Sequence, residues 1–263
     1  MDNKSKDIDK IRERWNEHAE TYDEWYTTFE GAVEHSVDWR LLQRYLPESR
    51  HARILDAAGG TGRIAAPLAH IGYSVTLCDI SRGMLDVARK KTLREGLSDT
   101  LRIVECDIRE LPFSDESFDF VLCWDGSTEA SRELIRVTKR TGWLSIFLMN
   151  RWAAAIRDFR SDPASVLGLC ESSAGYTEDD GVKYRTSSVE ETREFFQNEG
   201  IEVAEIYAVC GWMDVLAIPE GVARSRTWDE VLFRQTVEMT LRLAKEPSVR
   251  GLSRHLVVYG QKR

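Results

Sequence analysis

The stretch from Ile54 to Gly62 constrains the fold of this chain more than any other. Its sequence, ILDAAGGTG, is a short apolar run that meets an acid, Asp56, and then breaks into closely spaced glycines. A helix-like segment, residues 62–71, follows at once. Glycines let a backbone approach a ligand closely, and the free N–H groups at the start of a helix attract an anion. A strand, a glycine-rich turn and a helix in this order predict a nucleotide-binding corner of an α/β fold.

Strand-like and helix-like segments alternate after this corner, which is the pattern of a mostly parallel sheet covered on both faces. The apolar runs predict strands at residues 53–57, 74–78, 101–105, 118–123, 143–149, 201–209 and 255–260. Helical periodicity predicts helices at residues 7–30, 34–46, 62–71, 82–95, 128–139, 189–199 and about 227–245. The 263 residues therefore suit a single α/β domain with additions.

Composition limits the kind of partner. The chain has a net charge of −8, and it shows none of the basic clusters that grip a phosphate backbone, so we expect no nucleic-acid partner. Five cysteines occur singly without C-x-x-C spacing, which indicates a reducing compartment. The N-terminus lacks an apolar signal core, and no uncharged run of 18 residues exists. A cytoplasmic protein without a membrane partner is the expectation.

Two cofactors fit the glycine loop. Residues 60–65, GTGRIA, satisfy the dinucleotide fingerprint G-x-G-x-x-[G/A], and Asp79 lies near the spacing of its ribose-binding acid. An NAD(P)-binding oxidoreductase is therefore one interpretation. The other begins at Asp56, because residues 56–62 resemble the D-x-G-x-G-x-G loop of class I S-adenosylmethionine (SAM) methyltransferases. Ala58 stands at the first glycine, a mild departure if φ is negative there.

Motifs further along the chain favour the methyltransferase. The third predicted strand is followed by Asp107, where methyltransferases hold adenine and dinucleotide enzymes need no acid. Residues 118–125 resemble the fourth strand of that family. Residues 133–146 resemble its E-x-x-R-V-L-K-P-G-G-x-L segment, with Arg140 and Thr141 in place of Pro and Gly. No Y-x-x-x-K pair of a short-chain dehydrogenase is present.

As a set, these motifs make the chain similar to class I SAM-dependent methyltransferases of the small-molecule, UbiE-like type over residues 10–150. The resemblance implies a Rossmann-like, seven-stranded, mostly parallel sheet whose last strand is antiparallel. It also implies one domain, residues 1–263, with a helical N-terminal cap at residues 1–46. We expect insertions at residues 150–187 and 210–250 to form a lid over the methyl acceptor.

The resemblance assigns the cofactor residues. Asp56 and the loop backbone would hold the methionine end of SAM, Asp79 its ribose, and Asp107 its adenine amine. Two tyrosines in a segment similar to the A-x-x-Y-D-x-x-Y helix would lie near the carboxylate or the sulfonium, where an aromatic face attracts a cation. The full set for SAM and its product S-adenosylhomocysteine is Tyr22, Tyr26, Asp56, Ala58, Gly60, Gly62, Asp79, Ile80, Met84, Asp107, Ile108 and Trp124.

The chemistry of the acceptor stays open at this point. A hydroxyl acceptor needs a general base, whereas carboxylates and thiolates need none. The candidate catalytic residues are Asp125, after the fourth strand, and His18, one turn before Tyr22. Each also has a plain structural explanation, a turn for Asp125 and an exposed surface for His18. No metal is expected. A small-molecule acceptor is favoured, a SAM-binding protein without catalysis is the alternative, and the oligomeric state is undetermined.

Overall fold

The computed structural model describes residues 3–124, 130–159, 163, 166–168, 176–179, 182–209 and 219–263. Its strands are β1 (Arg53–Ala57), β2 (Ser74–Asp79), β3 (Leu101–Glu105), β4 (Phe118–Cys123), β5 (Thr138–Asn150), β6 (Tyr176–Asp179), β7 (Val182–Ser187), β8 (Ile201–Val209) and β9 (His255–Lys262). Its helices are α1 (Asn3–His18), η1 (Tyr22–Thr27), α2 (Phe29–Leu42), α3 (Ala65–His70), α4 (Arg82–Arg94), α5 (Ser131–Val137), α6 (Arg151–Asp158), α8 (Val189–Asn198), α10 (Glu220–Ala223), α11 (Glu230–Leu243) and α12 (Pro247–Leu252).

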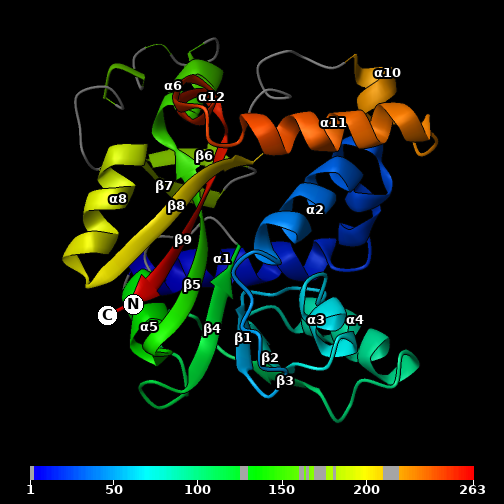
Figure 1. Cartoon of the computed structure of the whole chain (residues 1–263), viewed down its shortest axis with the longest axis vertical. Helices are drawn as coiled ribbons and strands as arrows, with labels where there is room; N and C mark the ends of the chain where they lie inside the picture. Colours follow the sequence, from blue (N-terminus) through cyan, green and yellow to red (C-terminus); the bar gives the residue numbers. More distant parts are fainter. Residues whose placement is uncertain are drawn as a thin grey trace.

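Seven strands form the expected core of the sheet, in the order β3-β2-β1-β4-β5-β9-β8 (Figure 1). Strand β9 runs antiparallel to β5 and β8, and the other neighbours along β3 to β5 are parallel. The prediction of a mostly parallel sheet with an antiparallel last strand is confirmed. Of the helices described, none is long and apolar enough to cross a membrane.

A two-stranded addition was not predicted. Strand β5 has 13 residues and continues past Ile146, the last residue that pairs with β4. Strand β7 pairs with the end of β5 that extends past β4, at Met149 and Asn150, and β6 pairs with β7. The hairpin therefore extends the sheet at the carboxyl end of β5, beyond the carboxyl end of β4.

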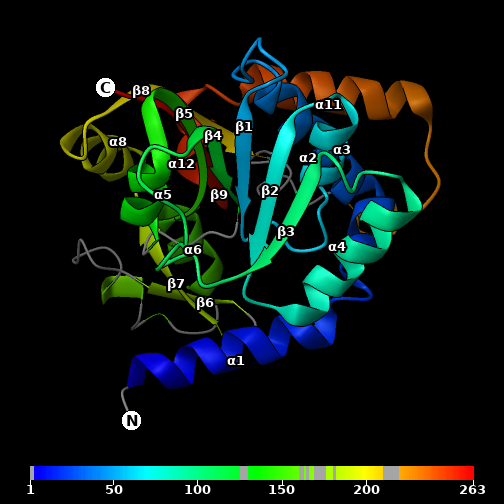
Figure 2. The ribbon, with the colours of Figure 1, turned by 90° about the horizontal axis from the view of Figure 1, so that it is seen from below.

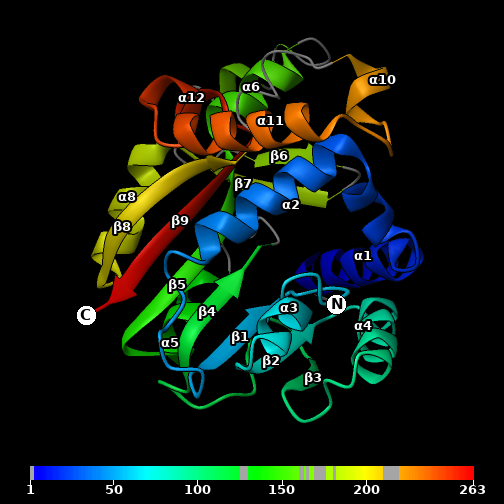
Figure 3. The ribbon, with the colours of Figure 1, turned by 45° about the vertical axis from the view of Figure 1, so that its right-hand side comes forward.

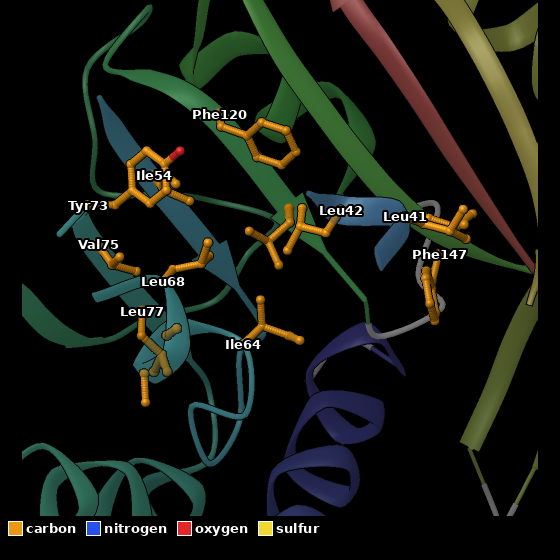
Figure 4. Close-up of a cluster of buried hydrophobic side chains, with 14 of the residues drawn as sticks. Leu41, Leu42, Ile54, Ile64, Leu68, Tyr73, Val75, Leu77, Phe120 and Phe147 are labelled. Atoms are coloured by element: carbon orange, nitrogen blue, oxygen red, sulfur yellow. The ribbon is translucent and has the colours of Figure 1, made fainter. Parts of the chain in front are cut away.

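Helices cover both faces of the sheet. On one face α2, α3, α4 and α11 pack against the strands around Ile54, Leu77 and Phe120, and Figure 4 shows Leu41 and Leu42 of α2 among them. On the other face α5 and α8 pack around Leu55, Val121 and Val258. Full burial of a Leu, Ile or Phe side chain contributes about 1.5–3 kcal/mol, so the two clusters provide most of the hydrophobic stabilisation. The cap helix α1 crosses the molecule below β3, β6 and β7 (Figure 2).

The single helix predicted at residues 7–30 is wrong. Helix α1 ends at His18, a 3-10 helix follows, and α2 starts at Phe29. Thr28 caps α2 by accepting a hydrogen bond from the backbone of Gly31 at 3.2 Å. A Cβ on Gly31 would lie 2.2 Å from the carbonyl oxygen of Trp25. The glycine allows η1 to pack closely against α2, and Figure 3 shows α1 and α2 as separate helices.

Thr141 occupies a backbone conformation that suits glycine. Its φ is 63°, at the position where the family motif has Gly, and a β-branched residue is strained there. We expect Thr141→Gly to raise the free energy of unfolding by about 1 kcal/mol. The neighbouring Arg140, which has no positive φ, is the control, and Arg140→Gly should lower it by about 0.5–1 kcal/mol. Urea denaturation measures both, and a destabilised Thr141→Gly variant would contradict the strain argument.

Candidate functional site

The glycine loop turns sharply between β1 and α3 at the carboxyl edge of the sheet. The backbone N–H of Gly59 donates to the carbonyl of Cys78 at 3.1 Å, which ties the loop to β2. The N–H of Gly62 donates back to Gly59 at 2.9 Å. Gly60 and Gly62 have φ values of 54° and 80°, a region that glycine enters without strain. The loop is thus held in one shape by its own backbone.

The expectation that Ala58 is a mild departure from glycine is wrong. That expectation required a negative φ, whereas Ala58 has a φ of 54°. The Cβ of an L-residue in this region clashes with its own backbone, which costs about 1–2 kcal/mol. The loop therefore keeps the backbone path of a glycine motif at an energetic cost, and this cost marks a position where shape takes precedence over stability.

Asp56 is buried behind the loop, with 3% of its surface exposed. A Cβ on Gly59 would lie 2.6 Å from the carboxyl carbon of Asp56, so only glycine fits beside this acid. Burial raises the pKa of Asp56 to about 7. Its Oδ2 accepts no hydrogen bond from any residue that the structure describes. A buried carboxyl oxygen in this state is suited to a cationic or hydrogen-bond-donating ligand.

Asp79 at the end of β2 organises both sides of the corner. Its Oδ2 accepts the N–H of Gly60 at 2.9 Å, and its Oδ1 accepts the N–H of Ser81 at 2.8 Å. Ser81 in turn caps α4 by accepting the N–H of Met84. Met84 is buried beside Gly60, and Ile80 is half-buried. Each carboxylate oxygen has a second lone pair, so Asp79 can accept a pair of ligand hydroxyls as well.

Asp107 has a partner that the sequence motif did not indicate. Its carboxylate accepts a fork of hydrogen bonds from the Arg109 side chain, the shortest at 2.6 Å, and one from the Arg109 backbone at 2.9 Å. Burial raises the pKa of Asp107, but these hydrogen bonds outweigh it and hold the pKa below its ordinary value. Ile108 beside it is half-buried. A ligand amine at this point would share the acid with Arg109.

Three side chains of the N-terminal cap fasten it to the nucleotide corner. Asn16 of α1 accepts hydrogen bonds at its Oδ1 from the Ser81 hydroxyl and from the Gly83 backbone, at 2.9 and 2.8 Å. Asp23 of η1 accepts the hydroxyl of Thr61 at 2.7 Å. Lys90 of α4 pairs with Glu20 at 2.7 Å. Sequence reasoning missed these contacts, although Asn16 and Asp23 lie inside the segment that resembles the cap motif.

Tyr22 and Tyr26 meet around Arg63, the residue that follows the loop. Their hydroxyls are 3.5 Å apart, and burial raises the pKa of both phenols. The guanidinium carbon of Arg63 lies 4.2 Å from the ring centroid of Tyr26 and 5.9 Å from that of Trp124. A guanidinium over aromatic faces gains cation–π attraction. Arg63 therefore joins the cap to the end of β4, which the sequence analysis did not foresee.

Arg63 also bridges to the second cap helix. Its Nη1 donates to Nδ1 of His35 at 3.0 Å and lies 3.3 Å from Oδ2 of Asp38. The Asp38 side chain is fully buried, and burial raises its pKa to about 8. Burial also raises the pKa of Glu34 one turn earlier, and Arg63 opposes this. The cluster formed by Glu34, His35, Asp38 and Arg63 is called the α2 cluster below.

Trp124 is part of an aromatic stack at the carboxyl ends of β4 and β5. Its ring lies 4.8 Å from that of Phe147 in a nearly parallel arrangement, and Phe147 lies 6.2 Å from His255. The indole N–H of Trp124 donates to the Ser145 hydroxyl at 2.9 Å. Burial and the nearby Arg254 lower the pKa of His255 to about 3, so this imidazole is neutral. The stack provides a flat, apolar surface beside the α2 cluster.

His18, one of the two candidate catalytic residues, does not enter this arrangement. His18 is exposed at the end of α1, and its Nδ1 hydrogen-bonds to the Arg14 carbonyl of its own helix at 2.8 Å. The structure thus favours the surface explanation for His18, because helix geometry holds the ring against its own backbone. Asp125 lies outside the described residues. The α2 cluster, which sequence reasoning missed, has no local motif, because its members meet only after folding.

Comparisons with known proteins agree with this geometry. A family model described as a methyltransferase domain matches residues 54–142. A ubiquinone/menaquinone biosynthesis C-methyltransferase of Stenotrophomonas maltophilia is 38% identical over 122 residues, covering 41% of this chain and 48% of that protein. A tRNA 5-carboxymethoxyuridine methyltransferase of Escherichia coli is 34% identical over 88 residues, covering 33% of this chain and 34% of that protein. The chain therefore spans less than half the length of these two relatives.

A solved structure extends the likeness to most of the chain. The S-adenosylmethionine-dependent methyltransferase of Mesorhizobium loti is 16% identical, and it covers 86% of this chain and 98% of its own with a TM-score of 0.56. At this level of identity the match concerns the fold.

Proposed function

Residues 54–142 form a class I methyltransferase domain, and from that premise we propose that the protein transfers a methyl group from SAM to a small molecule. The residues of the nucleotide corner fit this cofactor. The unpartnered Oδ2 of Asp56 suits the ammonium of the methionine moiety, and the carboxylate of Asp79 at the end of β2 suits the ribose hydroxyls. Ile80, Met84, Asp107 and Ile108 would surround the adenine. The observation that carries the proposal is this joint arrangement on successive strands.

The protein supplies alignment and exclusion of water, while the cofactor supplies an activated methyl group. Tyr22 and Tyr26 would cover the methionine end from the cap, and Trp124 would face the acceptor from the end of β4. We also propose that the cap at residues 1–46 and the insertions at 150–187 and 210–250 form the acceptor lid of one domain. The docking of Asn16 and Asp23 on the corner supports this role for the cap.

A small-molecule acceptor is proposed over a nucleic acid. The net charge of −8 supports it, since phosphate backbones bind to basic surfaces. The Stenotrophomonas maltophilia relative, by its name, acts in quinone biosynthesis, whereas the Escherichia coli relative acts on tRNA. Both relationships are partial, and the charge decides between them. A SAM-binding protein without catalysis remains the alternative, because His18 is exposed and hydrogen-bonds to its own helix.

Two measurements test the proposal. Calorimetry should show that S-adenosylhomocysteine binds and that NAD binds little. SAM with a tritiated methyl group should label a compound in a protein-free, RNA-free metabolite extract. Label that enters only RNA or protein would contradict the small-molecule acceptor. Binding of S-adenosylhomocysteine with no label in any fraction would favour the alternative without catalysis.

A further inference from the structure

Helix α2 turns titratable side chains toward the aromatic rings and Arg63. Glu34 and Asp38 lie one turn apart on the helix, and His35 lies beside them. The helix packs on the sheet through Val33, Val37 and Leu41, so its titratable side chains lie next to a hydrophobic core. Buried acids in such a place are costly unless they have a purpose or a partner. Each of the three residues therefore needs its own explanation.

His35 accepts a hydrogen bond from Arg63 and does not act as a base. A guanidinium has no acceptor, so Arg63 must donate to Nδ1 of His35 at 3.0 Å. In the neutral ring the proton is then on Nε2. Burial and the charge of Arg63 lower the pKa of His35 to about 4, which keeps the ring neutral near pH 7. Tyr26 contacts the ring edge to face, with centroids 6.1 Å apart.

Asp38 keeps Arg63 in place and has one oxygen left over. Its Oδ2 contacts Arg63 at 3.3 Å, while Oδ1 is buried and accepts no hydrogen bond from the described residues. Only 1% of the Asp38 surface is exposed. The charge of Glu34 adds to the effect of burial in raising the pKa of Asp38. Asp38 is therefore an internal support for Arg63, since its side chain has no exposed surface that a ligand could reach.

Glu34 is the acid that a ligand can reach. It is half-buried, and its carboxylate accepts one hydrogen bond, from the indole of Trp25 at 3.4 Å. The groups that face it are Tyr22 and Tyr26 of η1, Glu30 and Asp38 of α2, Arg63 after the glycine loop, and Arg254 before β9. These groups come from the cap, the nucleotide corner and the last strand. Glu34 is therefore at the centre of the three parts that would surround an acceptor.

We propose that α2 forms the polar side of the acceptor site, that the acceptor presents an N–H or O–H group to Glu34, and that Glu34 takes its proton while the buried Asp38 holds Arg63 beside it. This rests on the proposed methyl transfer. As the bond between the nucleophile and the methyl carbon forms, the carbon–sulfur bond breaks and its electron pair stays on sulfur. The proton of the nucleophile moves to the Glu34 carboxylate and then to water. Carboxylate and thiolate acceptors, which carry no such proton, are excluded from the site.

Arg63, Asp38 and His35 are positioning residues in this arrangement. Asp38 and His35 fix the guanidinium, and the guanidinium favours the ionised form of Glu34. Burial acts in the opposite direction and raises the pKa of Glu34 above that of an ordinary glutamate. A general base is most effective when its pKa is near the working pH, and the raised value brings Glu34 closer to that condition.

The test compares Glu34→Gln with Glu30→Gln, a neighbouring acid on the same helix. Transfer of tritium from SAM to the metabolite extract is followed from about pH 4 to about pH 9, which begins near the ordinary pKa of a glutamate, and the product is identified by mass spectrometry. The wild-type rate should rise with pH through the raised pKa of Glu34, and the product should be N- or O-methylated. Glu34→Gln should be roughly 100-fold slower or worse and lose this rise. Glu34→Asp should recover part of the rate, and Glu30→Gln should stay within about twofold of wild type.

A second readout does not depend on turnover. Carboxyl carbon NMR of the full chain should show one glutamate that titrates above the ordinary range, and this signal should be absent in Glu34→Gln. All variants should bind S-adenosylhomocysteine with nearly wild-type affinity. A methyl ester or a thioether as product would overturn the assignment of Glu34 as the base and leave the proposed methyl transfer intact. The same holds if Glu34→Gln keeps the wild-type rate and pH profile. Wild-type protein that binds S-adenosylhomocysteine but labels nothing would overturn the proposed function and this assignment with it.

Discussion

Replacing Asp79 by Ala should weaken the binding of S-adenosylhomocysteine by about 100-fold or more. The carboxylate would accept two ribose hydroxyls, and charge-assisted hydrogen bonds contribute about 1.5–3 kcal/mol each. The same carboxylate also accepts hydrogen bonds from the backbone N–H groups of Gly60, at 2.9 Å, and Ser81, at 2.8 Å. The substitution removes both bonds and so loosens the loop. Calorimetry at constant pH and salt measures the change directly.

The matched control is Asp86→Ala on α4. Asp86 is exposed and pairs with Arg89 of the same helix at 2.6 Å. An exposed pair of this kind contributes little, so the affinity should not change. The affinity of Asp79→Asn for S-adenosylhomocysteine should lie between those of Asp79→Ala and Asp86→Ala, since the amide retains one carbonyl acceptor. Unchanged affinity in Asp79→Ala would remove Asp79 from the cofactor site and would weaken the proposed binding mode as a whole.

Replacing Arg63 by Met should cause the largest loss of stability among the substitutions considered. Arg63 contacts Asp38, His35 and the ring of Tyr26, and the Asp38 side chain has no exposed surface. Above pH 8, where Asp38 is ionised, removal of one partner from this buried ion pair costs about 3–5 kcal/mol, because the remaining group stays desolvated. For a chain of this size this corresponds to a fall in Tm of roughly 6–15 °C. Scanning calorimetry and urea denaturation measure the change.

The loss should depend on pH in a defined direction. The pKa of Asp38 in the folded protein is about 8, above its ordinary value of 3.8, so the folded state holds this proton more tightly than the unfolded state. Stability then falls as the pH rises between these two values. Without Arg63 the ionised form of Asp38 is less favourable still. The difference in the free energy of unfolding between wild type and Arg63→Met should therefore grow from pH 6 to pH 9.

Two comparisons make the Arg63 result specific. Arg89→Met removes an exposed ion pair on α4 and should change the free energy of unfolding by less than about 1 kcal/mol. The double variant Arg63→Met with Asp38→Leu should recover part of the stability, because no buried acid remains. If Arg63→Met were as stable as Arg89→Met, the Arg63 ion pair would not fasten the cap to the corner.

The strands were predictable because each one is a local pattern. The strands at 53–57, 101–105, 118–123 and 201–209 have the predicted bounds in the structure. Buried parallel strands are short continuous apolar runs that end in turn residues, and this pattern needs no knowledge of neighbours. The N-terminal helices were predicted less well, because the break near Thr28 depends on the close packing of Gly31 against Trp25, which is a tertiary contact.

The nucleotide corner was predictable for a related reason. Asp56, Asp79 and Asp107 lie at or just beyond the carboxyl end of a strand, and the carboxyl ends of neighbouring parallel strands meet at one edge. The sequence itself therefore determined the fold class, the glycine loop and the acids proposed to hold the cofactor. It did not indicate that Arg109 donates hydrogen bonds to Asp107 or that Ala58 has a positive φ. Both depend on the conformation that the backbone takes in the folded protein.

Only the tertiary structure decided the composition of the acceptor side. Arg63 and Asp38 are 25 residues apart in sequence, and Trp124 lies a further 61 residues along the chain from Arg63. No period or motif connects such positions, and each has an ordinary local explanation when taken alone. They become a cluster because α2 packs across the sheet beside the glycine loop, where burial brings acids, a guanidinium and aromatic rings into one low-dielectric space. That environment is a property of the folded chain, since it depends on which surfaces exclude water together.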